Sequence, residues 1–136
     1  MNWLLSSLVA MVCWGVWGLF LKLALKYFNW QQTFVVTSIL TLTASLLILL
    51  WSKPMINVGS TGFVYSLAAG VLGLVALLAF YSAIGSGKAI IVVPLTALYP
   101  VVTTILSYLI LREEISLIKG LGIVLALVAL LLVSIE

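Results

Sequence analysis

Three residues of the first apolar stretch combine a cation, an aromatic ring and a glycine, whose missing side chain leaves space beside the helix. Trp14, Gly18 and Lys22 are spaced four apart, which places them on one face of a helix. Together they could line a pocket, with Lys22 attracting an anionic group and Trp14 bounding an apolar part of a ligand. The alternative is that Trp14 is a packing residue and Lys22 extends its ammonium to the lipid headgroups. The residues themselves leave both interpretations open.

A second group of candidates surrounds two prolines. Pro94 and Pro100 interrupt one long apolar stretch, and Tyr99 lies between them. Each proline removes a helical hydrogen bond, and in lipid the freed carbonyl groups need a neighbouring helix, a hydroxyl or water. Thr96, Thr103 and Thr104 are near enough in the sequence to help. The two prolines therefore predict a kinked, mobile helix beside a cavity. Tyr81 and Tyr99 could line this cavity.

The residues that most enzymes and metal sites need are scarce. The chain has no histidine, one cysteine (Cys13), and no acidic residue before Glu113. Neither a zinc site nor an internal disulfide can be built from this set. No nucleophile is paired with a base, and no carboxylate in the middle of an apolar stretch offers itself for proton coupling. We therefore expect a protein that is not an enzyme and holds no cofactor or metal.

The candidate residues lie within five long apolar stretches. Hydrophobic residues make up 65% of 136 positions, charged residues make up 7%, and the mean hydropathy is +1.41. About 20 apolar residues suffice to span the ~30 Å hydrocarbon core as a helix. The sequence thus predicts an all-α integral membrane protein whose partner is the lipid bilayer. Its transmembrane helices are expected at Trp3–Leu25, Phe34–Trp51, Thr61–Ile84, Ala89–Leu111 and Leu117–Ile135.

The basic residues are divided equally between the two membrane faces. With five spans, one face carries Lys53, Arg112 and Lys119, and the other carries Lys22, Lys26 and Lys88. An excess of Lys and Arg in short loops normally orients a membrane protein, and no excess exists here. The excess of basic over acidic residues is therefore read as topology, and no nucleic-acid partner is expected. Either small errors in the span boundaries hide a bias, or the chain inserts in both orientations or pairs with an oppositely oriented partner.

Small and hydroxyl side chains suggest how the helices pack. Ala69 and Gly73 in the third span have the spacing that permits a close helix crossing. Thr37 belongs to a row of hydroxyl residues in the second span, which usually bond back to a carbonyl one turn earlier. These features favour a structural role for both helices.

The order and spacing of these residues resemble those of an EamA domain, the unit of the drug/metabolite transporter superfamily. The resemblance rests on Trp14–Gly15 followed by Lys22, and then on the second half of the chain. There it comprises Ala89, Pro94, Leu98, Pro100, Val101, the segment LILREEIS with Glu113 and Ser116, and Gly122. It covers residues 1–136 and implies a single EamA-like transmembrane domain that forms one inverted-repeat unit.

The resemblance implies a function that the residues alone do not indicate. Most members carry two such units in tandem around a central cavity and move small metabolites by alternating access, a design seen in many transporters. A single unit implies an antiparallel homodimer, or a heterodimer with a similar half-length chain, which would fit the equal charge tally. The residues expected in the pathway are Trp14, Gly18, Lys22, Tyr81, Pro94, Tyr99 and Pro100.

Two alternatives and a location complete these expectations. The chain could be an accessory subunit that stabilises a membrane partner through its small-residue helix faces. It could also belong to a flippase for lipid-linked sugars, with Lys22 and Lys88 as the candidates to hold a phosphate. We expect it in the plasma membrane of a bacterium, the inner membrane where two are present.

Overall fold

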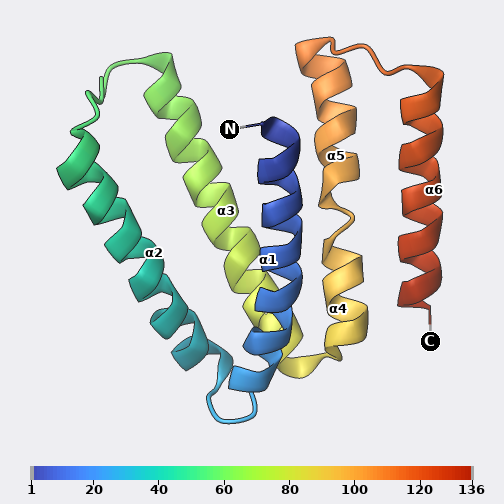
Figure 1. The fold of residues 1–136 in the computed structure, drawn as a ribbon, viewed down its shortest axis with the longest axis horizontal. Helices are drawn as coiled ribbons and strands as arrows, with labels where there is room; N and C mark the ends of the chain where they lie inside the picture. The colour runs from blue at the N-terminus through green and yellow to red at the C-terminus, as the bar shows by residue number, and fades with distance from the viewer. Residues whose placement is uncertain (1, 136) are drawn as a thin grey trace. The chain divides into compact units, whose positions relative to one another are not determined.

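The fold was analysed in a computed structural model that describes residues 2–135, without the side chains of residues 119, 133 and 134. All regular secondary structure among the described residues is helical. The elements are α1 (Trp3–Ala24), α2 (Trp30–Ser52), α3 (Thr61–Ser86), α4 (Ala89–Thr96), α5 (Tyr99–Leu106), η1 (Ser107–Leu111) and α6 (Leu117–Ser134) (Figure 1). The chain divides into two compact units, Met1–Gly85 and Ser86–Glu136, and each is considered separately.

The prediction of an all-α membrane protein is confirmed by the lengths of these helices. Four segments are long and apolar enough to cross a bilayer: Trp3–Ala24, Trp30–Ser52, Thr61–Ser86 and Ala89–Leu111. The apolar part of α6 among the described side chains, Gly120–Leu132, is shorter. All four long spans remain largely exposed in the single chain, as expected for helices whose surroundings are lipid or other membrane helices.

The second helix starts earlier than its hydropathy indicates. We expected it to begin at Phe34, because Gln31 and Gln32 are polar, but α2 begins at Trp30. Asn29 caps the helix by accepting from the Gln32 backbone amide at 2.8 Å, while the Gln32 side chain accepts from the Asn29 amide at 3.0 Å. This reciprocal pair satisfies two amides that the first turn leaves without helical partners. The two polar residues therefore belong to the helix.

The core of the first unit lies where α1 ends, α2 begins and α3 ends. Leu21, Thr33, Tyr81 and Ile84 are each at most 3% exposed. The opposite halves of α2 and α3 present their apolar side chains outward, with Leu47 61% and Leu72 70% exposed. Packing within this unit is thus concentrated at one end, where α1 and α3 cross (Figure 1).

The fourth span is divided into two helices. We expected one kinked helix over Ala89–Leu111, but α4 ends at Thr96 and α5 begins at Tyr99, with Ala97 and Leu98 forming a turn (Figure 1). The reason is local, because Pro100 lacks the amide that a continuous helix would direct to the carbonyl of Thr96. The proline pair therefore predicted the position of the distortion, and the distortion is a full interruption.

The second unit ends in an antiparallel arrangement of α6 with the fourth span. After α5 the chain forms a π-helical turn, η1, which ends at Arg112 in the left-handed conformation (φ 56°). The turn reverses the chain, and α6 then packs against α4.

Candidate functional site

A lysine joins two helix ends in the first unit. Lys22 lies in the last turn of α1 and is partly buried, and its Nζ donates to the carbonyl oxygen of Ile84 at 2.8 Å. Ile84 lies in the last turn of α3, where backbone carbonyl groups carry the negative end of the helix dipole. The ammonium therefore interacts with a second helix inside the unit.

A second polar contact in the same unit is almost completely enclosed. The hydroxyl oxygens of Tyr81 in α3 and Thr37 in α2 lie 2.6 Å apart, and Tyr81 is 1% exposed. The Thr37 hydroxyl is also within bonding distance of the carbonyl oxygens of Thr33 (3.1 Å) and Phe34 (3.0 Å). Since a hydroxyl has one proton to give, Thr37 donates to its own helix and accepts from Tyr81.

Aromatic rings surround this hydrogen bond. The ring of Trp17 stacks on that of Phe80 with centroids 5.5 Å apart, and it meets the Tyr81 ring edge-on at 6.1 Å. The ring of Phe34 meets the other side of Tyr81 at 5.4 Å. These residues form an aromatic clamp, defined as Trp17, Phe34, Phe80 and Tyr81, that joins α1, α2 and α3.

The sequence prediction captured only part of this group. It named Gly18, Lys22 and Tyr81, and all three lie in or beside the packed end, with Gly18 buried. Trp14 is 64% exposed in the single chain. Of the predicted row Trp14–Gly18–Lys22, only Gly18 and Lys22 therefore belong to the packed end. Trp17 and Phe34 were not singled out for the pathway. The signals for them are the spacing of Trp17 to Leu21, four residues, and of Phe34 to Thr37, three residues, because each spacing places the pair on one helix face.

The remaining three predicted site residues surround the break in the second unit. Pro94 precedes the break and is partly exposed, while Tyr99 and Pro100 follow it and are exposed, Tyr99 by 58%. The Val101 amide donates to the carbonyl of Leu98 at 3.0 Å, whereas a continuous helix would direct it to Ala97. The break therefore removes the helical donors of two adjacent carbonyl groups, those of Thr96 and Ala97.

The nearby threonine hydroxyls do not replace those donors. Thr96 Oγ1 donates back to Val92 or Val93, at 2.8 and 3.0 Å. Thr103 and Thr104 donate to the carbonyl oxygens of Tyr99 and Pro100 at 3.3 and 2.8 Å. Our expectation that these residues relieve the proline-induced loss is therefore wrong for the carbonyl of Thr96, because each hydroxyl serves a carbonyl within its own short helix.

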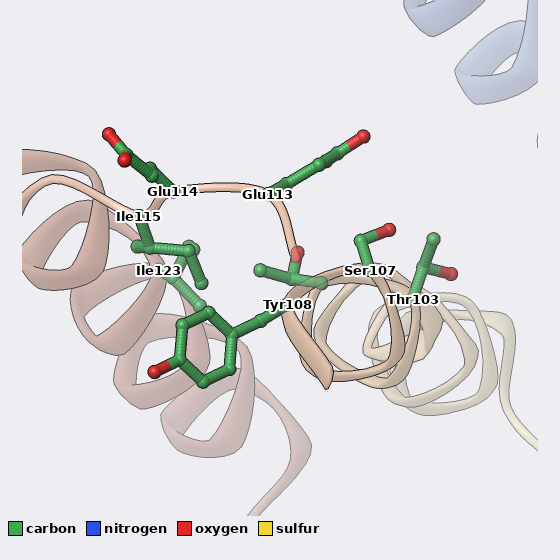
Figure 2. Close-up of a pocket in the computed structure, with 8 residues that line it drawn as sticks. Thr103, Ser107, Tyr108, Glu113, Glu114, Ile115 and Ile123 are labelled. Carbon is green, nitrogen blue, oxygen red and sulfur yellow. The ribbon is translucent and has the colours of Figure 1, made fainter. Parts of the chain in front are cut away.

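A polar pocket of about 210 Å³ lies at the far end of the same unit (Figure 2). It is lined by Thr103, Thr104, Ser107, Tyr108, Glu113, Glu114, Ile115 and Ile123. Figure 2 shows the two carboxylates on the connection after η1, directed away from each other, with the Tyr108 ring below them. Hydroxyls, carboxylates and a phenol make this a water-accessible depression at the end of a span.

The described side chains offer no group of three or more His, Cys, Asp or Glu that could hold a metal ion. The chemistry on offer is recognition by a lysine ammonium, hydroxyl groups, aromatic rings and unpaired backbone carbonyl groups. Such groups can bind and orient a ligand.

Comparison with known proteins also indicates a helical membrane protein. Residues 1–135 match the model of the EamA-like transporter family. An uncharacterized protein of Methanocaldococcus jannaschii is 33% identical over 136 residues, an alignment that covers 98% of this chain and 96% of the relative. No solved structure matches the chain.

Proposed function

The chain belongs to the EamA-like transporter family, and from this premise we propose that it carries a small metabolite across a membrane by alternating access. Family membership supports membrane transport in general. The particular mechanism rests on features of the two units.

The observation that carries the proposal is the break between α4 and α5. Irregular backbone at membrane depth is tolerated where it is buried in protein or faces a water-filled cavity, because lipid offers no hydrogen-bonding partner. Interrupted helices form the substrate sites of many secondary transporters. A break flanked by Pro94 and Pro100 is thus suited both to bind a solute and to bend during transport.

The proposed working unit is a dimer of oppositely oriented chains. Transporters with inverted repeats place their site between two units related by an axis in the membrane plane. The relative from Methanocaldococcus jannaschii is similar to this chain over 96% of its own length. The equal charge tally permits both orientations. We therefore propose a homodimer, or a heterodimer with a similar chain, in the plasma membrane.

Within this proposal the predicted residues take distinct roles. Pro94, Tyr99 and Pro100 flank the break, which faces the solute in this proposal, and Trp14 lies on an exposed face available to the dimer cavity. Lys22 and Tyr81, with Gly18 beside them, hold one end of the first unit closed through the contacts to Ile84 and Thr37. The closed end would act as the gate on one side of the membrane.

The proposal is tested by reconstitution of the purified chain into liposomes. Isotope-labelled amino acids and other small metabolites are offered singly, and counterflow into preloaded vesicles is compared with that into empty ones. We expect saturable counterflow of at least one solute with this chain alone or with a co-purified similar chain. Activity only after addition of an unrelated membrane protein would indicate an accessory subunit, and movement of lipid-linked sugars alone would indicate a flippase.

A further inference from the structure

We propose that the break between α4 and α5 binds a primary ammonium group of the transported solute through the backbone carbonyl oxygens of Thr96 and Ala97. This assignment rests on the proposed transport function and names the class of solute.

The break lies deep in the membrane-spanning segment. The eight residues of α4 advance the chain by about 12 Å from the start of the span, against a hydrocarbon core of ~30 Å. Backbone groups at this depth do not reach the headgroups. An unsatisfied carbonyl there costs several kcal/mol in lipid.

Two consecutive backbone carbonyl groups at this depth lack a hydrogen-bond donor among the described residues. Pro100 has no amide proton for the carbonyl of Thr96, and the Val101 amide is used by Leu98 at 3.0 Å instead of Ala97. The nearby hydroxyls of Thr96, Thr103 and Thr104 are directed to other carbonyl groups. Two adjacent carbonyl oxygens, at the C-terminal end of α4 where the helix dipole is negative, are therefore available to an external donor.

Backbone carbonyl oxygens at the negative end of a helix dipole favour a cationic donor with N–H groups. No acidic residue occurs before Glu113, so the acceptors at this depth are neutral dipoles. A primary ammonium has three rotatable N–H donors, which two carbonyl oxygens and an aromatic face could satisfy. Tyr99 is 58% exposed at the same turn and offers such a face. A hard metal cation would seek about six oxygen ligands, more than the break supplies.

The test measures binding to the intact purified chain in detergent, with methylammonium as the probe. Thermal unfolding is followed in methylammonium, tetramethylammonium and sodium chlorides at equal ionic strength. We expect methylammonium alone to raise the Tm in a saturable manner. Tetramethylammonium carries the same charge without an N–H donor, and sodium tests for an alkali-ion site.

The decisive variant is Pro100→Ala, which supplies an amide to the carbonyl of Thr96 and favours a continuous helix. We expect it to weaken methylammonium binding about tenfold or more, since a hydrogen bond to a charged group is lost. Pro54→Ala, in the connection between α2 and α3, is the matched control and should bind as the original chain does. If Pro100→Ala does not fold, Tyr99→Leu serves instead, with an expected several-fold loss from the missing aromatic face.

Three results would overturn the assignment. They are equal stabilisation by methylammonium and tetramethylammonium, unchanged binding in both variants, and stabilisation by sodium alone. The test needs no transport, so its failure is distinguishable from failure of the proposed function. Solute counterflow without methylammonium binding would refute the ammonium site but support the transport function. Methylammonium binding without counterflow of any solute would support the site but refute the transport function.

Discussion

The hydroxyl oxygens of Thr37 and Tyr81 lie 2.6 Å apart across α2 and α3, and this contact is chemically asymmetric. Thr37 retains a partner in its own helix if Tyr81 loses its hydroxyl, because its Oγ1 lies 3.1 Å from the carbonyl of Thr33. Tyr81, which is 1% exposed, has no such local partner. Removal of either hydroxyl should therefore have different consequences.

We expect Thr37→Val to destabilise the chain more than Tyr81→Phe. The first change leaves a buried phenol without its acceptor, at a cost of about 1–3 kcal/mol, whereas the second removes a bond worth about 0.5–1.5 kcal/mol. The free energy of unfolding, measured by SDS titration in mixed micelles, checks the order. In the Tyr81→Phe background, Thr37→Val should cost little, since no phenol remains to be stranded. Equal costs in both backgrounds would contradict the asymmetry.

Lys22 offers a second stability prediction. Lys22→Met keeps the apolar stem but removes the bond from Nζ to the Ile84 carbonyl (2.8 Å), and we expect a loss of about 1–3 kcal/mol. Lys26→Met, at an exposed position in the turn that follows α1, is the matched control and should change stability by less than about 0.5 kcal/mol. The same SDS titration measures both. Similar effects would mean that Lys22 contributes only general charge.

A third prediction separates two glycines of α3. A Cβ atom at Gly85 would lie 3.3 Å from the Cβ of Trp30 in α2, while at Gly73 it would meet nothing within 4 Å. Gly85→Val should therefore force α2 and α3 apart and destabilise the chain by about 1–3 kcal/mol. Gly73→Val makes the same exchange in the same helix, so it controls for the difference in helix propensity between glycine and valine, and it should not destabilise the single chain.

The Gly73 variant also tests the proposed dimer. The open space at Gly73 belongs to the small-residue face with Ala69, and such faces allow close helix approach in lipid. If a second chain packs there, Gly73→Val should reduce cross-linking or energy transfer between labelled chains in liposomes. Undiminished association would place the dimer contact on another face.

The positions of the helices could be predicted from the sequence, and their mutual contacts could not. Hydropathy locates four spans within a few residues, because length and apolarity suffice to place a helix in a bilayer. It misplaced the start of α2, since Gln31 and Gln32 are polar, although the Asn29–Gln32 pair could have corrected it. The pairing of Thr37 with Tyr81 bridges 44 residues, and no local pattern encodes which helix faces meet.

The candidate site divides in the same way. Proline chemistry predicted the distortion of the fourth span, since a missing amide acts on a neighbour in the sequence. It did not predict that the Thr96 hydroxyl would donate to the carbonyl of Val92 or Val93. Nor did it predict that the backbone carbonyl of Thr96 would be left without a donor in the described part of the chain. That choice depends on the conformation of the turn, which forms only when the helix has been broken.

The proposed antiparallel homodimer requires the chain to insert in both orientations, and the equal number of basic residues on the two membrane faces makes this requirement testable. Adding one lysine to either face should fix the orientation, because that face then carries the excess. Asn57→Lys adds to the face of Lys53, and Tyr27→Lys, at an 85% exposed position, adds to the face of Lys26. C-terminal reporters active on opposite membrane faces should give both signals for the original chain and one, opposite, signal for each variant. Each variant alone should then lose solute counterflow, and the two expressed together should regain it. Full counterflow by one fixed variant would contradict the antiparallel homodimer, since all its chains would share one orientation.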